Sequence, residues 1–215
     1  MVKCVVFDLD GTLVDSVPDL TAALNRLMLS RGQDAFDDAA VTGMVGDGVK
    51  ALLDRAFAAR GRVTDAGAMA EFLADYTENA AVLTRLYPGV VETLTTLRDE
   101  GWRLAVCTNK PQAPARAILE TLGLMSFFAA LGGGDSFAVR KPDPGHLAAT
   151  LAAAGGDPTR SVMIGDHHND IHAAHGVGAK AIWAAWGYGR DVEGGDAVAS
   201  GFLELPGIIS GFGIV

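Results

Sequence analysis

Short apolar runs alternate with amphipathic segments along most of the chain. The run Cys4–Phe7 is rich in β-branched residues, is too short for a helix and ends in a turn signal, which predicts a buried strand. Similar runs recur in the second half of the sequence. The predicted strands are 4–7, 103–107, 127–131, 161–164, 180–184 and 197–198.

The segments between these strands carry apolar residues at helical spacing and predict helices. One of them starts at Val90 and stops before Gly101, because glycine is a common helix C-cap. The predicted helices in this part of the chain are 90–100, 111–122, 144–154 and 169–175. Alternating strands and helices indicate βαβ crossovers, so we expect an α/β fold with a Rossmann-like parallel sheet and helices on both faces.

Residues 18–84 have a different pattern, because helical spacing continues there without strand-like alternation. The apolar positions that recur include Leu20, Leu24, Leu27, Leu52, Leu53, Phe72 and Tyr76. The pattern predicts a bundle of helices inserted after the first strand. We therefore expect a core domain of residues 1–15 and 86–215 and an all-helical inserted domain of residues 16–85.

Acidic side chains follow two of the predicted strands. Asp8 comes directly after the first strand, Asp10 lies two residues further on, and Asp166 follows the strand 161–164. In an open parallel sheet the ligand lies beyond the carboxyl ends of the strands, so these carboxylates should meet in one crevice. Carboxylate oxygens are ligands that Mg²⁺ prefers. The sequence therefore predicts a Mg²⁺ site held by Asp8, Asp10 and Asp166.

The same carboxylates suit covalent phosphate chemistry. Asp8 is the candidate nucleophile, since a carboxylate can form an aspartyl-phosphate. Asp10 is the candidate general acid and base, which would protonate the leaving oxygen and later deprotonate the attacking water. Asp170 begins a predicted helix, so it either supports the metal site from behind or only caps that helix.

Clustered carboxylates repel each other and a phosphate, so the site also needs a cation. Lys141 is the best candidate, because prolines fix its loop, Arg140–Pro144, and that loop leads toward the same edge of the sheet. Thr108 and Asn109 follow the strand 103–107 and offer a hydroxyl and a backbone N–H to phosphoryl oxygens. We therefore assign Thr108 and Lys141 to catalysis, and both of them with Asn109 to substrate binding.

Composition limits the function further. The chain has 215 residues, is 49% hydrophobic and carries a formal net charge of −9 at pH 7, which argues against nucleic-acid binding. No apolar run reaches the roughly 18 residues of a membrane-spanning helix. The first strand begins within three residues of the start, which leaves no room for a signal peptide. We expect a cytoplasmic protein without a nucleic-acid or membrane partner.

Cysteine and histidine residues offer weaker alternatives. Cys4 and Cys107 each lie in an apolar strand-like run, so we expect two buried, reduced thiols. His168, His172 and His175 share one helical face, and the first two have zinc-like spacing. No Glu follows His168 to serve as a base, and the neighbouring carboxylates suit a harder ion. Packing or surface histidines are the favoured interpretation.

Four motifs together resemble the haloacid dehalogenase superfamily from end to end of the chain. They are Asp8–Ser16, Thr108–Lys110, Lys141–Pro144 and Gly165–Asp170. A helical insertion directly after the first motif is similar to the C1-cap members, in which the inserted domain caps the active site. The resemblance implies hydrolysis of a phosphomonoester with Mg²⁺, through an aspartyl-phosphate on Asp8.

Within this superfamily the chain is most similar to phosphoglycolate phosphatases. The similarity lies in Asp15-Ser16 at the end of the first motif, in Val45–Lys50 and in Tyr87–Gly89. The resemblance implies conversion of 2-phosphoglycolate to glycolate and phosphate. Alternatives are a phosphatase of another small metabolite (a sugar phosphate, a nucleotide or pyrophosphate), a β-phosphoglucomutase-like phosphoryl transferase, and a non-catalytic module. Asp10 disfavours a dehalogenase, and the lack of a His after Asp15-Ser16 disfavours the mutase. The chain departs from the family pattern at His167, the position after the motif aspartate, where many relatives carry Ser or Thr.

The inserted domain is expected to set the substrate. The loop Gly46–Gly48 opens a helix whose N-terminus could face an anion, and Lys50 and Arg55 could bind a second negative group such as a carboxylate. Segments 14–18 and 86–89 are the expected hinges for closure of this cap. We expect a small phosphorylated metabolite as the partner, and a monomer or a homodimer.

Overall fold

The structure is a computed structural model that describes residues 2–190 and 192–214. Its centre is a six-stranded sheet in the order β5-β4-β1-β6-β7-β8, and all the neighbouring strands in it are parallel. The strands are β1 (Val2–Phe7), β4 (Arg103–Cys107), β5 (Phe128–Gly132), β6 (Gly156–Gly165), β7 (Lys180–Ala184) and β8 (Ala197–Ala199). The predicted α/β fold with a parallel sheet is confirmed.

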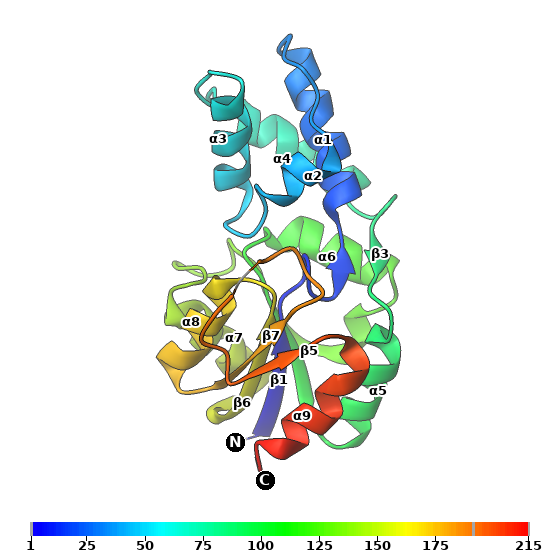
Figure 1. Cartoon of the computed structure of the whole chain (residues 1–215), viewed down its shortest axis with the longest axis vertical. Helices are drawn as coiled ribbons and strands as arrows, with labels where there is room; N and C mark the ends of the chain where they lie inside the picture. The colour runs from blue at the N-terminus through cyan, green and yellow to red at the C-terminus, as the bar shows by residue number, and fades with distance from the viewer. Residues whose placement is uncertain (1, 191, 215) are drawn as a thin grey trace.

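Alternate side chains of the strands belong to two apolar clusters, one on each face of the sheet. In β1, Val5 and Phe7 pack into one cluster, whereas Cys4 and Val6 pack into the other. The helices that cover the first face are α5 (Val90–Asp99), α6 (Gln112–Thr121) and α9 (Leu205–Gly211), and those on the second are α7 (Pro144–Ala154) and α8 (His168–Val177) (Figure 1). Both cysteines are free and buried, as predicted.

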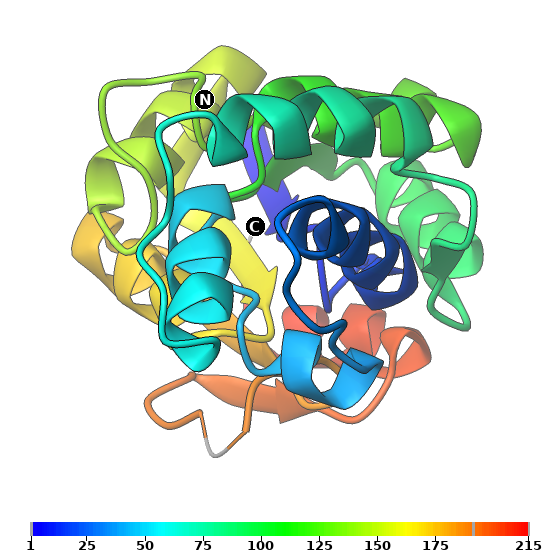
Figure 2. The same ribbon diagram turned by 90° about the horizontal axis from the view of Figure 1, so that it is seen from above.

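The predicted helical insertion lies above the carboxyl ends of the sheet strands (Figure 1). It consists of α1 (Val17–Ser30), α2 (Asp38–Thr42), α3 (Val49–Ala59) and α4 (Ala68–Asn79). The view from above in Figure 2 shows these helices ranged around the end of β1. The insertion therefore lies at the edge of the sheet where the polar residues after the strands come together. Among the described residues, no helix is both long and apolar enough to cross a membrane.

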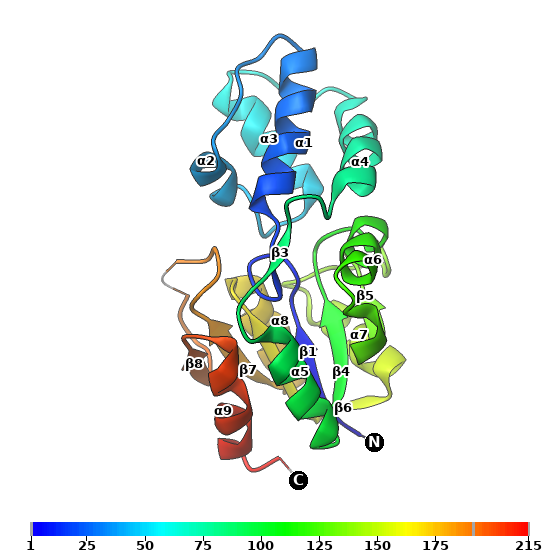
Figure 3. The same ribbon diagram turned by 90° about the vertical axis from the view of Figure 1, so that its right-hand side faces the viewer.

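The chain passes between the two parts through a pair of short antiparallel strands (Figure 3). These are β2 (Val14–Asp15) and β3 (Arg85–Leu86), and they pair Val14 with Leu86 and Asp15 with Arg85. The sequence did not predict them, because two residues are too few to show an alternating pattern. They bring the two crossings side by side at the base of the insertion.

The sequence did not predict the last helix, α9, and the other elements differ from the predictions mainly at their ends. The largest difference is β6, which starts at Gly156 rather than at Ser161. Its first residues include Asp157 and Pro158, which normally indicate a turn, and its pairing with β1 shifts register between Val2 and Cys4. Two short 3-10 helices, Met125–Phe127 and Phe202–Glu204, were also not predicted.

A buried carboxylate connects the two segments that join the insertion to the core. Asp19, in the first turn of α1, is only 3% exposed. It accepts hydrogen bonds from the backbone N–H groups of Leu83 (2.9 Å) and Thr84 (2.7 Å), and from the Thr84 hydroxyl (2.7 Å). Buried donors left without a partner are costly, so Asp19 should stabilise the base of the insertion.

We predict that Asp19→Ala lowers the free energy of unfolding by about 2–4 kcal/mol, because it leaves these donors buried and unpaired. Urea denaturation measures the loss. Asp38→Ala, at an exposed site in α2, is the control and should change stability by less than about 0.5 kcal/mol. An Asp19→Ala protein as stable as this control would contradict the assignment.

Candidate active site

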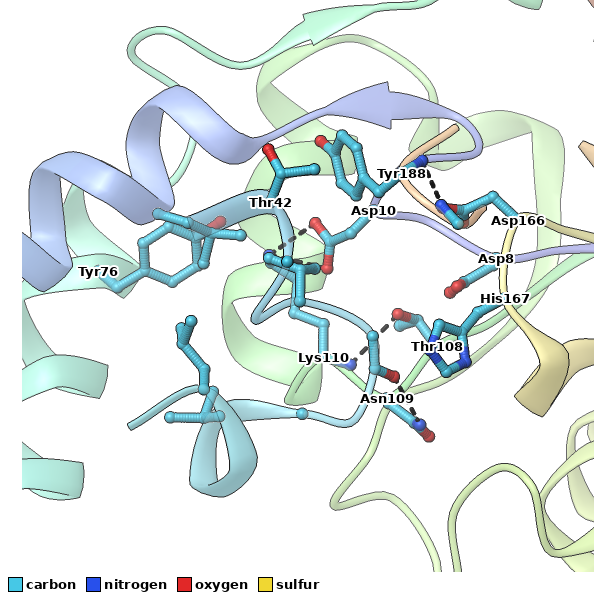
Figure 4. A pocket seen from close by; sticks show the side chains of 18 residues that line it. Asp8, Asp10, Thr42, Tyr76, Thr108, Asn109, Lys110, Asp166, His167 and Tyr188 are labelled. Atoms are coloured by element: carbon cyan, nitrogen blue, oxygen red, sulfur yellow. Dashed lines mark hydrogen bonds and ion pairs between the residues drawn. The ribbon is translucent and has the colours of Figure 1, made fainter. Parts of the chain in front are cut away.

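Asp8 lies at the carboxyl end of β1, where its own backbone N–H donates to Ile164 of the neighbouring β6 (2.9 Å). The side chain is 8% exposed and faces a pocket between the core and the insertion (Figure 4). Its Oδ1 accepts a hydrogen bond from the Leu9 N–H (2.7 Å) and lies 3.0 Å from Lys141 Nζ. The strand thus fixes the carboxylate, and the pocket gives a ligand access to it.

Two further carboxylates, from Asp166 and Asp170, converge on Asp8. One oxygen from each of the three lies within 4.8 Å of the others, and all three residues are buried. Two glycines make the approach possible. A Cβ on Gly11, which has a φ of +78°, would collide with the Asp166 carboxylate, and a Cβ on Gly165 would collide with Asp170.

The acidic group is electrostatically strained without a cation. Burial raises the pKa of the Asp166 carboxyl to about 7, and the nearby charges of Asp8 and Asp170 act in the same direction. Hydrogen bonds from the Thr12 hydroxyl (3.0 Å) and the Tyr188 N–H (2.8 Å) oppose this rise only in part. Three buried carboxylates with oxygen ligands in one place are a donor set for a hard divalent cation.

Lys141 supplies one positive charge inside this group. Its Nζ donates to Asp170 Oδ1 (2.5 Å) and to the Cys107 carbonyl (2.6 Å), besides its contact with Asp8. Burial opposes the charged form of Lys141, but the Asp170 and Asp8 carboxylates outweigh it and raise its pKa. The ammonium therefore stays charged and bridges the two carboxylates.

His146 holds the loop that carries Lys141. The Lys141 backbone N–H donates to His146 Nδ1 (3.2 Å), and His146 Nε2 lies 3.1 Å from the Gly133 carbonyl. This pair of contacts requires the neutral ring with its hydrogen on Nε2. His146 is fully buried, and burial together with the Lys141 charge lowers its pKa to about 4.

Asp10 points away from the three clustered carboxylates. Its carboxylate accepts hydrogen bonds from the Ser16 hydroxyl (2.5 Å) and from Lys110 Nζ (2.8 Å). Burial opposes the charge of Lys110, but Asp10 and Tyr76 outweigh it and raise its pKa. Sequence reasoning missed Lys110 as a site residue, although it is the last residue of the Thr108–Lys110 motif.

Asp170 makes contacts of both kinds that the sequence left open, and its support of a metal site stays a prediction. It lies in the first turn of α8, where the His167 N–H donates to its Oδ2 (3.1 Å), and His167 in turn caps the helix. The same carboxylate also holds Lys141 in place. One side chain thus contacts both the start of α8 and Lys141.

The pocket has a volume of about 180 Å³ and is shared by the two parts of the chain. Its polar side comes from the core, with Asp8, Asp10, Thr108, Asn109, Lys110, Asp166, His167 and Tyr188. Its apolar side comes from the insertion, and includes Leu20, Val45, Val49, Leu52 and the ring of Tyr76. Figure 4 shows the labelled side chains around the common space.

The loop Gly46–Gly48 of the insertion is in contact with the core. The Gly46 carbonyl accepts a hydrogen bond from Asn109 Nδ2 (3.1 Å), and Asp47 Oδ1 accepts one from Asn169 Nδ2 (2.8 Å). A Cβ on Gly46 would lie 2.7 Å from the ring of His167. The insertion is therefore seated on the core at the mouth of the pocket.

Lys50 and Arg55 do not line the pocket. Lys50 is exposed and pairs with Asp54 on α3 (2.6 Å). Arg55 pairs with Asp47 and donates to the Met44 carbonyl (2.8 Å), so it supports the loop before α3. Contact of Lys50 and Arg55 with a substrate stays a prediction. Their positions outside the pocket do not support it.

The three histidines of the weaker zinc alternative, His168, His172 and His175, do not belong to the group formed by Asp8, Asp166 and Asp170. The rings of His168 and His172 meet edge to face with centroids 5.7 Å apart. His175 contacts Asp196 (3.0 Å) near the exposed end of α8. None of the three is in the acidic group or among the described residues that line the pocket.

Comparison with known proteins connects this geometry to a family. Residues 2–178 match the model of the haloacid dehalogenase-like hydrolases. A phosphoglycolate phosphatase of Rhodospirillum rubrum is 43% identical over 199 residues, covering 89% of this chain and 83% of its own length. One from Mesorhizobium japonicum is 42% identical over 188 residues, covering 86% and 83%. The crystal structure of a predicted phosphoglycolate phosphatase from Haemophilus somnus superposes with a TM-score of 0.88 at 30% identity, covering 96% of this chain and 97% of that one.

We predict that His146 makes the protein less stable as the pH falls. The unfolded chain takes up a proton on this histidine near pH 6.5 and the folded protein only near pH 4, so stability falls as the pH drops between these values. The loss attributable to His146 should be on the order of 2 kcal/mol between pH 7 and pH 4.5. Urea denaturation of the wild type and His146→Leu across this range measures it.

At pH 7 the His146→Leu protein should be the less stable of the two, because the Lys141 N–H loses its acceptor. The difference between the two proteins should narrow as the pH falls. A difference that stays constant from pH 7 to pH 4.5 would show that His146 is not held neutral.

Proposed function

The chain belongs to the haloacid dehalogenase-like hydrolase family, and from that premise we propose that it hydrolyses 2-phosphoglycolate to glycolate and phosphate with Mg²⁺. The observation that carries the proposal is the convergence of Asp8, Asp166, Asp170 and Lys141 beside a pocket closed by the insertion. The substrate follows from the names of the relatives, which are more than 40% identical over most of the chain.

In the proposed reaction a carboxylate oxygen of Asp8 attacks phosphorus, and the bond between phosphorus and the ester oxygen breaks. Asp10, which must enter this step protonated, gives its proton to the departing glycolate oxygen and is left as a carboxylate. Asp10 then takes a proton from water, whose oxygen attacks the phosphorus of the aspartyl-phosphate and releases phosphate and free Asp8. Both carboxylates line the same pocket, which supports this division of roles.

The donor set fits a hard cation, because its oxygens come from carboxylates that repel each other when buried. We propose that Asp8 and Asp166 hold Mg²⁺, with Asp170 behind them on Lys141. Asp10 stays a predicted third ligand. Its carboxylate is occupied by Lys110 and Ser16, so it would contribute its backbone carbonyl. When bound, the cation supplies charge that stabilises the phosphoryl oxygens.

The remaining groups position the phosphoryl group and exclude water. Thr108 and Asn109 line the same pocket as Asp8, and Lys141 Nζ lies 3.0 Å from Asp8 Oδ1. We propose that the Thr108 hydroxyl, the Asn109 backbone and Lys141 bind the phosphoryl oxygens. The apolar side chains of the insertion cover the pocket and would keep bulk water from the aspartyl-phosphate. The paired crossings β2 and β3 are the proposed hinge through which the insertion opens for exchange.

We predict that the protein releases phosphate from 2-phosphoglycolate with a kcat/KM at least about tenfold above that for glucose 6-phosphate, AMP or pyrophosphate. EDTA should abolish turnover, and added Mg²⁺ should restore it. A malachite-green phosphate assay measures both.

Asp8→Asn should lower kcat by at least about 10³-fold, because the nucleophile is lost.

Asp99→Asn, at an exposed position of α5, is the matched control and should retain wild-type activity. Wild-type turnover by Asp8→Asn would refute the nucleophile. Equal activity on all four compounds would refute the proposed substrate and leave the phosphatase chemistry standing.

A further inference from the structure

A buried cation lies in the wall of the pocket where the core meets the insertion. Lys110 is 5% exposed, and its Nζ lies 2.8 and 3.1 Å from the two carboxylate oxygens of Asp10. The same Nζ lies 4.6 Å from the ring centroid of Tyr76 on α4. Figure 4 shows the side chain reaching between Asp10 and Tyr76. The ammonium group is thus held at a defined place beside the candidate general acid.

The charges around the pocket are otherwise negative. Of the described residues that line it, Asp8, Asp10 and Asp166 carry carboxylates, and Lys110 is the only lysine or arginine. Lys141 is bound to Asp170 and Asp8 and does not line the pocket. A substrate with a second anionic group therefore has one fixed cation to meet, and that cation lies on the core side.

The distances suit a very small substrate. To protonate the ester oxygen, Asp10 must approach it to about 2.6–3.2 Å. In 2-phosphoglycolate a single methylene joins that oxygen to the carboxylate. When the ester oxygen lies at Asp10, the carboxylate is therefore within reach of the ammonium group that already contacts Asp10. A longer substrate would carry its second charge past this point.

The hydroxyl of Tyr76, close to Lys110, is a second donor and lacks an acceptor. It is buried, it belongs to a residue that lines the pocket, and no hydrogen-bond acceptor for it is found among the described residues. A buried hydroxyl that makes no hydrogen bond is costly, and a ligand that brings an acceptor removes the cost. A carboxylate at Lys110 would bring such an acceptor to the same corner of the pocket.

We propose that Lys110 Nζ, assisted by the Tyr76 hydroxyl, binds the carboxylate of the substrate and makes the protein select esters that carry one next to the phosphate. The inference rests on the proposed function. It gives Lys110 the role that the sequence suggested for Lys50 and Arg55, whose side chains lie outside the pocket.

The test compares kcat/KM for 2-phosphoglycolate with kcat/KM for 2-hydroxyethyl phosphate, in which a neutral alcohol replaces the carboxylate. The wild type should prefer 2-phosphoglycolate, and Lys110→Met should lower that preference roughly 10- to 100-fold, mainly through a higher KM for the carboxylate ester. Loss of the contact with Asp10 affects both esters alike, so the ratio isolates the carboxylate.

Lys180→Met removes an exposed lysine of β7 and should leave the preference unchanged, and Lys110→Arg should retain most of it. If Lys110→Met fails to fold, Lys110→Gln must show the same loss. A preference that survives in the folded neutral variant would overturn the inference and leave the proposed function intact. No preference in the wild type would instead overturn the proposed substrate, and the inference with it.

Discussion

The site depends on one lysine placed between carboxylates. Asp8 and Asp170 are buried close to Asp166, and their repulsion in a region of low dielectric would be prohibitive without compensation. Lys141 contacts two of them, at 3.0 and 2.5 Å, and is itself fixed through its backbone by His146. The remaining negative charge is what makes the group suited to a divalent cation and, through it, to an anionic phosphoryl group.

Backbone geometry serves the same arrangement. Gly11 and Gly165 let carboxylates approach where a Cβ would collide with them. The insertion then closes the other side, because its loop Gly46–Gly48 rests on the core at Asn109. The candidate catalytic carboxylates therefore come from strand ends, whereas the apolar wall of the pocket comes from a part joined to the core through β2 and β3. Such a division allows one chemical centre to serve different substrates when the walls change.

Much of this arrangement was predictable, because strand ends fix positions that are distant in sequence. Asp8 and Asp166 follow parallel strands that are neighbours in the sheet, so their meeting follows from topology alone. The Thr108–Lys110 motif drew attention to Lys110, but its contacts could not be predicted, since they depend on where Asp10 turns and on how α4 places Tyr76 beside it. Lys50 shows the converse case: its charge suggested a substrate contact, which stays a prediction, and in the structure its side chain is exposed and pairs with Asp54.

Binding of Mn²⁺, a stand-in for Mg²⁺, followed by electron paramagnetic resonance, tests the central claim most directly. The account predicts one strong site per chain in the wild type. In a folded Asp166→Asn protein, this affinity should be at least about tenfold weaker, because a charged oxygen ligand is lost. Wild-type affinity in Asp166→Asn would contradict the claim that these converging carboxylates hold a single divalent cation.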